Sequence, residues 1–210
     1  SSIRGQEILN ARILWDIRMP RTLAALILGG ALALAGYLLQ TFFHNPIAGP
    51  FVLGISSGAK MMVALFMVFF MGRSIKVTSF TMILAAFLGA MICMGFVLLM
   101  ARRVNRMSML VVSGVMIGYI CSAITDFIVT FAEDSDIVNL HGWSQGSFSG
   151  MNWSNVQVAV IVIGVTTVLT FFLSKPIGAY QLGEAYAQSM GVNIRFFRVA
   201  LILLSSILSA

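Results

Sequence analysis

Long apolar runs, each ended by a short polar or proline-containing stretch, dominate the pattern of hydrophobic and polar positions. Crossing a ~30 Å hydrocarbon core takes about 20 helical residues at 1.5 Å each, and a helix satisfies its own backbone hydrogen bonds within one segment in lipid. The pattern therefore predicts an all-α, polytopic membrane protein with about six transmembrane helices in a single domain over residues 1–210. The predicted spans are 22–43, 51–72, 77–101, 109–132, 155–174 and 196–210. The sixth run reaches Ala210, so we expect a fragment of a longer protein.

The first apolar run is rich in small residues, which let a neighbouring backbone approach closely. This predicts a helix that is buried among other helices rather than facing lipid. Two prolines, Pro46 and Pro50, end the run because proline lacks an amide hydrogen and fixes φ. The small residues of the run are Gly29, Gly30, Ala31, Ala33, Ala35 and Gly36.

Composition supports the membrane assignment. The chain is 59% hydrophobic and only 10% charged, whereas soluble domains carry roughly 25% charged residues. Its net charge of +6 is attributed to loop arginines and lysines beside anionic lipid head groups rather than to nucleic acid. Cys93 and Cys121 are expected to be small buried side chains, and neither His44 nor His141 has a partner at metal-ligand spacing.

Three polar segments separate or precede the apolar runs. Residues 1–16 are interpreted as an amphipathic lead-in, residues 133–154 as a polar loop, and residues 175–193 as a connector that is too polar to span a membrane. Within the connector, residues 182–191 predict a short helix between Gly183 and Gly191. Glu184 suits the positive end of that helix, and Gly191 suits its C-terminal stop.

The fourth span carries a candidate functional face. Gly114, Gly118, Ser122 and Asp126 follow one another at four-residue spacing, and a carboxylate in a membrane span is expensive. One interpretation is that this face lines a solute pathway. The other is that the glycines pack against a helix while Asp126 reaches the outer interface. Lys60 has the same ambiguity: it either extends to the interface or faces the passage and meets an anionic solute.

A specific set of residues surrounds the first two spans and resembles the FecCD-type permeases. These are the membrane subunits of ABC importers for iron-siderophores, haem and vitamin B12, and the resemblance implies about ten helices in the whole protein. The order and spacing of the set carry the resemblance more than any one residue does. Its members are Arg18, Pro20, Arg21, Gln40, Asn45, Pro46, Gly54, Ser57 and Gly58.

The resemblance also implies roles for two regions. The helix of Gly114 and Asp126 corresponds to the helix that lines the central passage, and residues 182–191 resemble the segment that docks on the ATPase. Met190 stands where leucine is more usual. The residues carried over to the docking role are Leu182, Gly183, Glu184, Ala185, Ala187 and Gly191.

The resemblance further implies partners and placement. It predicts a second permease copy, two ATPase subunits on the cytoplasmic side and an extracytoplasmic solute-binding protein, in a bacterial cytoplasmic (inner) membrane. Residues 1–21 would lie outside, whereas residues 45–46, 102–106 and 175–193 would lie inside. No cofactor or metal is expected on this chain, because ATP and Mg²⁺ would bind the partner ATPase.

Two other functions stay open at this stage. The chain could be an ion-coupled secondary transporter with Asp126 and Lys60 as the coupling pair, although that leaves residues 182–191 without a role. It could also be a membrane scaffold that transports nothing. An enzyme is not expected, since the sequence has neither the phosphate-binding pattern G-x-x-x-x-G-K-S/T nor an arguable catalytic set.

Overall fold

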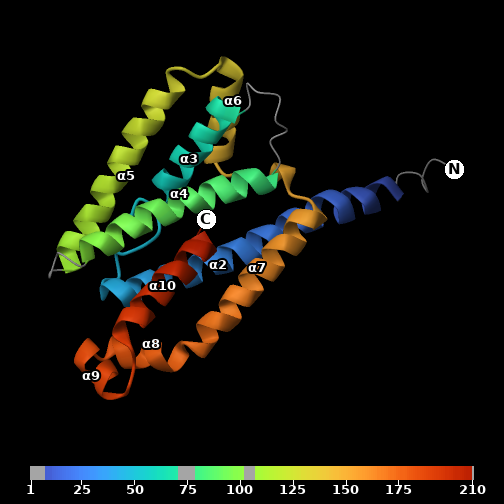
Figure 1. The fold of residues 1–210 in the computed structure, drawn as a ribbon. Coiled ribbons are helices and arrows are strands. Elements are labelled where there is room, and N and C mark those ends of the chain that lie inside the picture. The colour runs from blue at the N-terminus through green and yellow to red at the C-terminus, as the bar shows by residue number, and fades with distance from the viewer. Residues whose placement is uncertain (1–7, 71–78, 102–106, 210) are drawn as a thin grey trace.

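The computed structural model describes residues 8–70, 79–101 and 107–209, and these residues form helices and turns without a strand (Figure 1). The chain is helical from Ile8, and a π-helical segment, η1, leads directly into the long helix α2. The elements are η1 (Ile13–Arg18), α2 (Met19–Phe43), α3 (Ile55–Phe70), α4 (Ser79–Ala101), α5 (Met107–Val129), α6 (Asp134–Ser144), η3 (Phe148–Gly150), α7 (Trp153–Phe172), α8 (Ser174–Gln181), α9 (Glu184–Ser189) and α10 (Ile194–Ser209).

Four helices of the described part of the chain are long and apolar enough to cross a membrane. They contain the stretches 8–43, 81–100, 109–129 and 153–172. The predicted all-α membrane fold is therefore confirmed, with helix ends that differ from the predicted spans by a few residues. The other two predicted spans correspond to shorter helices, α3 and α10, each of 16 residues. Residues 73–76, between the second and third predicted spans, and residues 102–106, which were expected to lie inside, are outside the described residues.

The second predicted span begins too early. Residues 51–54 form turns, and α3 begins only at Ile55. The turns satisfy their own amides: Leu53 N donates to Gly49 O at 3.2 Å, and Ile55 N donates to Pro50 O at 3.2 Å. Apolar composition alone therefore extended the predicted span over residues whose backbone is not helical.

This irregular segment reaches deep into the bundle. Gly54 packs against Gly118, which is the middle residue of the 23-residue helix α5. Non-helical backbone at membrane depth is tolerated where protein covers it, and the side chains of Ala48 and Leu53 are buried here. Helix α3 is short because the non-helical residues before it already reach the middle of α5.

The helices pack in two groups that share a core. Helix α2 lies against α7 and α10, while α3 lies against α4 and α5, as Figure 1 shows. The largest buried cluster joins both groups, since it contains Phe42 and Leu38 of α2, Met94 of α4, and Leu201 and Ile202 of α10. Apolar contacts along the inner face of α10 thus connect the first helix of the chain to α4.

Up to Gly36, one face of α2 is covered, whereas its last two turns are buried on most sides. Ala24, Ala31, Ala35, Leu38 and Phe42 are buried at spacings that place them on one side of a helix. By contrast, a Cβ atom added at Gly29, Gly30 or Gly36 would meet nothing within 4 Å. Among the described residues, the predicted burial against other helices is therefore found at Ala31 and Ala35 and is not found at these three glycines.

Two polar segments that were expected to be a loop and a connector contain helices. In the predicted loop 133–154, α6 has Asp134 and Asp136 in its first turn and His141 in its last turn. This charge order complements the helix dipole and is the signal that sequence reasoning overlooked. Helix α8 likewise occupies much of the predicted connector, with Pro176 in its first turn, where proline is tolerated.

Candidate functional site

The described helices meet at two ends with different chemistry. At one end, shown at the lower left of Figure 1, the C-terminal end of α2 lies beside α8, α9 and the start of α10. At the other end, η1 lies near the start of α7, where Trp153 Nε1 donates to Trp15 O at 3.0 Å. The rings of these two tryptophans are 5.3 Å apart. Amphipathic rings of this kind are typical of a membrane–water interface.

The arginine–proline motif lies at the tryptophan end. Pro20 is buried where the π-helical segment η1 passes into α2, and because proline has no amide hydrogen it removes one backbone hydrogen bond from this continuous helix. Arg21 Nη2 donates to Ser149 O at 2.7 Å, which joins α2 to η3. The side chain of Arg18 is exposed, and its carbonyl oxygen accepts from Thr22 Oγ1 at 3.0 Å. Two of the three motif residues therefore have a visible structural role.

The motif at the end of α2 forms a compact turn. His44 caps α2 with a left-handed φ of 47°, and Asn45 N donates to Gln40 O at 3.2 Å. Asn45 Oδ1 accepts from Ile47 N at 2.9 Å, a local turn typical of asparagine before proline. Pro46 is exposed. This part of the motif turns the chain back into the bundle.

Gly54 brings α5 into direct contact with the chain that precedes α3. A Cβ atom at Gly54 would lie 2.8 Å from Gly118 N and 2.9 Å from Gly114 O. Gly54 also has a φ of +72°, which side-chain-bearing residues rarely adopt. The glycines of α5 therefore serve close backbone packing, which was one of the two interpretations of this face.

Gly58 forms the matching contact between α3 and α4. A Cβ atom here would lie 2.6 Å from Gly89 O, and one at Gly89 would overlap the Gly58 carbonyl group. Ser57 lies between the two contacts, with its Oγ 3.7 Å from the Cβ position of Gly118. The motif residues Gly54, Ser57 and Gly58 thus hold α3 against both of its neighbours.

The remaining candidates on α5 face away from this contact. Ser122 and Asp126 are exposed, whereas Cys121 and Thr125 are buried. A four-residue step advances about 400° around a helix with 3.6 residues per turn, so each step drifts about 40°. Two glycines and two polar residues that share a spacing therefore do not share a face. Asp126 lies three residues before the end of α5.

Lys60 lies inside the bundle rather than at one of its ends. Its neighbour Met61 packs with Cys93 and Cys121 in one buried cluster, because α3 starts at the depth of Gly118. Lys60 is half-buried, and it forms no ion pair with Asp126. The interpretation that Lys60 reaches the interface from the start of a span does not fit this depth.

The cysteines are buried, as expected, and the structure brings them together. Their Sγ atoms lie 3.4 Å apart between α4 and α5, and neither residue is in a disulfide. Among the described residues, no group of three or more His, Cys, Asp or Glu side chains could hold a metal ion. The two cysteines therefore pack as small apolar side chains between α4 and α5.

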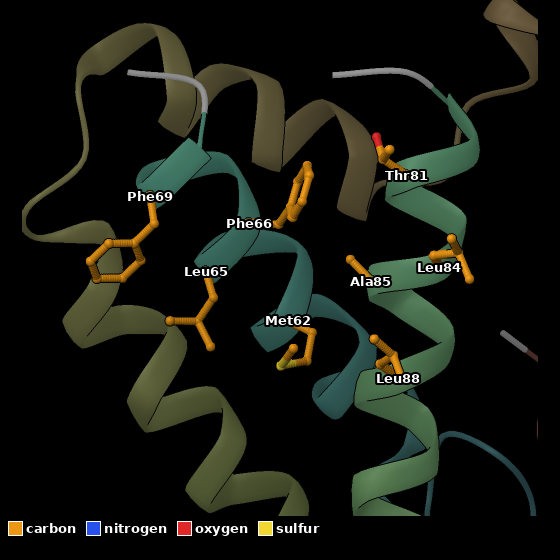
Figure 2. Close-up of a pocket in the computed structure, with 8 residues that line it drawn as sticks. All are labelled: Met62, Leu65, Phe66, Phe69, Thr81, Leu84, Ala85 and Leu88. Carbon is orange, nitrogen blue, oxygen red and sulfur yellow. The ribbon is translucent and has the colours of Figure 1, made fainter. Parts of the chain in front are cut away.

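An apolar hollow of about 370 Å³ lies between the C-terminal half of α3 and the N-terminal half of α4 (Figure 2). Met62, Leu65 and Phe66 of α3 face Ala85 and Leu88 of α4 across it. It offers almost no polar surface to orient a solute, and Leu88 is half exposed at its rim, at 52%. The hollow is therefore typical of a surface that contacts lipid acyl chains rather than of a solute-binding site.

The predicted short helix of residues 182–191 is present as α9, from Glu184 to Ser189. Gly183 precedes it with a φ of +123°, and Gly191 follows it with a φ of +84°. At its end, Gly191 N donates to Gln188 O and Val192 N donates to Ala187 O, each at 3.0 Å. These two bonds form a Schellman motif, so both glycines are needed for their backbone conformations.

Helix α9 and the residues next to it present an apolar ridge to the surroundings. Leu182, Tyr186 and Met190 are 73%, 47% and 64% exposed; Tyr186 lies in α9, Leu182 precedes Gly183 at the end of α8, and Met190 caps the C-terminal end of α9. Ala185 is exposed beside them, whereas Ala187 is fully buried. A six-residue helix outside the spans with an uncovered apolar ridge has the character of a protein-docking element.

The opposite side of α9 joins a polar network. Glu184 Oε1 accepts from Tyr180 Oη at 2.9 Å and forms an ion pair with Arg198 Nη2. Arg198 Nε lies 3.4 Å from Tyr180 Oη. Burial raises the pKa of Tyr180 to about 12, so its hydroxyl stays protonated and able to donate near neutral pH. Sequence reasoning found Glu184 but not its two partners.

The arrangement of the helices defines a class of protein. Within the described residues, four long apolar helices, the shorter apolar helix α3 and a glycine-bounded helix outside them are typical of a multi-pass α-helical membrane protein. The chain belongs to the FecCD transport family, whose profile matches residues 2–210.

Similar proteins agree with this family. The vitamin B12 import system permease protein BtuC of Salmonella newport (strain SL254) is 36% identical over 191 residues, covering 90% of this chain and 57% of the relative. The protein of the same name from Salmonella typhimurium (strain LT2) is 36% identical over 190 residues, covering 90% of this chain and 56% of the relative. The chain thus spans little more than half the length of these relatives.

A solved structure has the same fold. It is described as an inward-facing conformation of a proposed metal-chelate-type ABC transporter, and it matches with a TM-score of 0.81 at 23% identity. The match covers 96% of this chain and 63% of the other chain. The arrangement of helices is therefore shared, which is as far as this likeness reaches.

Proposed function

We propose that this chain is part of the permease of an ABC importer, and that α9 is its docking element for a separate ATPase. The exposed ridge of Leu182, Tyr186 and Met190 is the observation that carries the proposal. The similar proteins are named as vitamin B12 import permeases, which supports the importer class. The mechanism would be alternating access, in which ATP-bound ATPase subunits bind one permease state better than the other.

The proposed complex has two permease copies, two ATPase subunits and an extracytoplasmic solute-binding protein. The end that carries α8 and α9 would face the cytoplasm, and the end that carries Trp15 and Trp153 would face outward. This orientation rests on the family resemblance, because the exposed Arg12 and Arg18 at the tryptophan end balance the exposed Lys175 and Arg195 at the α9 end.

The solute pathway is proposed to run along the exposed side of α5. Ser122 and Asp126 are on this side, whereas Gly114 and Gly118 hold α5 in position from behind. Lys60, half-buried at mid-depth, is a further candidate for contact with an anionic group of the solute. The solute would be a metal chelate of the iron-siderophore, haem or cobalamin type.

An ion-coupled transporter is the weaker alternative. Asp126 lies near one end of α5, and Lys60 lies at the depth of the buried cysteines without an ion pair to Asp126. That alternative also gives no role to the ridge on α9. A scaffold without transport would tolerate apolar residues at both Ser122 and Asp126, whereas the importer proposal expects transport to fall in that double variant.

The test is co-purification of the complete protein with its candidate ATPase. We expect Tyr186→Asp to lose the ATPase, because a charge on the ridge would have to be buried at the interface. Gly183→Pro should lose it as well, because proline cannot adopt a φ of +123°. The matched control is Val138→Asp, which places the same charge on an exposed apolar position, 69% exposed, of α6.

Retention of the ATPase by Tyr186→Asp, or equal loss in Val138→Asp, would overturn the docking role of α9. Failure of the wild-type protein to bind any ATPase would overturn the importer proposal itself. Transport assays with Asp126→Asn would then come first, since the ion-coupled alternative requires that carboxylate.

A further inference from the structure

Arg198 reaches from α10 to the inner side of α9. It forms an ion pair with Glu184, the first residue of α9, and its Nε lies 3.4 Å from Tyr180 Oη. The side chains of Arg198 and Glu184 are 31% and 37% exposed. The charge on Glu184 is therefore directed into the chain, whereas the uncovered ridge of α9 faces away from it.

Tyr180 carries the same network to the end of α2. Its side chain is fully buried, and its hydroxyl lies 3.5 Å from Phe42 O. His44 Nε2 donates to Tyr180 O at 3.1 Å. The neighbouring Gln181 Nε2 lies 3.3 Å from Thr41 Oγ1 and 3.2 Å from Tyr37 Oη. The last two turns of α2 are thus bonded to α8 at several points.

The composition of this network separates it from ordinary packing. Glu184 accepts from two donors on two different elements, α8 and α10. An ion pair that is about one-third exposed contributes little to stability, yet it fixes position because its geometry is directional. Only Ala187 of α9 is buried, so α9 has little else to hold it in place.

We propose that Arg198 is a positioning residue: together with Glu184 and Tyr180 it ties α9 to α10 and to the end of α2. A displacement of α9 then moves the ends of both helices, while the apolar ridge alone makes the contact with the ATPase. This inference rests on the proposed docking role of α9, and it adds the path by which docking acts on the spans.

The tie makes a specific prediction about charge. If Glu184 acts through Arg198, then exchanging the two charges restores the tie, since the double variant Glu184→Arg/Arg198→Glu places opposite charges on the same two positions. If Glu184 instead contacts the ATPase directly, the exchange places a positive charge at the interface and restores nothing.

The experiment compares Glu184→Arg, Arg198→Glu and the double variant in the complete protein. Arg198→Lys is the conservative variant. Arg195→Glu is the matched control, because Arg195 is exposed on the same helix and forms no ion pair among the described residues. Three quantities are measured: ATPase co-purification, Mg-ATP hydrolysis by the reconstituted complex relative to the isolated ATPase, and amide hydrogen exchange over residues 184–192.

We expect both single variants to retain the ATPase. The change in the ATP hydrolysis rate that the permease causes should be smaller in them than in the wild type, on the order of threefold or more. The double variant and Arg198→Lys should recover most of that effect. Amide exchange over 184–192 should accelerate in the single variants and not in Arg195→Glu. A purely structural contact would lower thermal stability in the single variants without changing the hydrolysis rate of the assembled complex.

Three outcomes would overturn the positioning role of Arg198. They are single variants that hydrolyse ATP as the wild type does, a double variant whose hydrolysis rate is no closer to the wild type than those of the single variants, or unchanged amide exchange. Failure of the proposed function is distinguishable, because then the wild-type protein binds no ATPase. In that case the amide hydrogen exchange alone is the test: equal amide exchange over residues 184–192 in Arg198→Glu and Arg195→Glu would contradict the positioning role of Arg198.

Discussion

Two contacts that hold this bundle together differ in kind. At the junction of α3, α4 and α5, backbones touch at the glycine pairs Gly54–Gly118 and Gly58–Gly89, and the side chains of Cys93 and Met62 lie against the second pair. At the junction of α8, α9 and α10, the contact is made by the polar ends of Tyr180, Glu184 and Arg198.

The difference indicates which part of the chain can move. A contact between backbones has one geometry and fails when a methyl group is added, because interiors are close-packed. A contact between half-exposed charged side chains can break and re-form at small cost. The glycine junction therefore suits a rigid unit of three helices, whereas the polar junction suits a joint that responds to a partner.

The strongest test of rigidity is Gly89→Ala. A methyl group here would overlap the Gly58 carbonyl, and neither backbone can yield without moving a helix, so we expect a loss of about 3 kcal/mol or more. Thermal unfolding in detergent measures it. Gly95→Ala is the control on the same helix, since a Cβ there meets nothing within 4 Å; equal effects in the two variants would contradict a rigid junction.

Gly54→Ala sharpens the same comparison by separating strain from crowding. Gly54 and Gly146 have φ values of +72° and +70°, but a Cβ at Gly146 meets nothing within 4 Å. Gly146→Ala should cost about 1 kcal/mol for the backbone conformation alone. Gly54→Ala should cost about 2–3 kcal/mol because crowding against α5 is added. Similar unfolding midpoints for both would mean that α5 yields easily.

Tyr180 provides a pH test of the polar junction. Its pKa is raised from 10.0 to about 12, so the folded state keeps the proton longer than the unfolded chain does. The stability tied to this proton is present below pH 10 and is lost as the pH rises to about 12, on the order of 2 kcal/mol. The measurement is the difference in unfolding between wild type and Tyr180→Phe across that range. A constant difference would contradict a buried, protonated Tyr180.

The smallest expected effect is that of Arg198→Gln on stability at neutral pH. Because the ion pair with Glu184 is about one-third exposed, its loss should cost less than about 1 kcal/mol. Thermal unfolding beside Arg195→Gln is the comparison. A loss as large as that of Gly89→Ala would show that the polar junction is a rigid contact as well, and the contrast between the two junctions would disappear.

The local features of this protein followed from its sequence. Apolar runs of 20 residues or more have few alternatives to spanning helices, since lipid offers no partner to a free amide, and α2, α4, α5 and α7 appear close to where they were expected. The glycines that bound α9 were also readable, because Gly183 and Gly191 act within their own few residues.

Features that depend on distant segments followed only from the tertiary structure. The start of α3 depends on the contact of Gly54 with Gly118, 64 positions away in the chain. Which side of α5 is covered depends on where α3 packs, and the ion-pair partner of Glu184 lies on α10. The sequence by itself determined the long apolar helices and the glycine-bounded helix α9, because each depends on residues within its own segment. The structure alone decided which faces meet, because burial and pairing need the other partner in place.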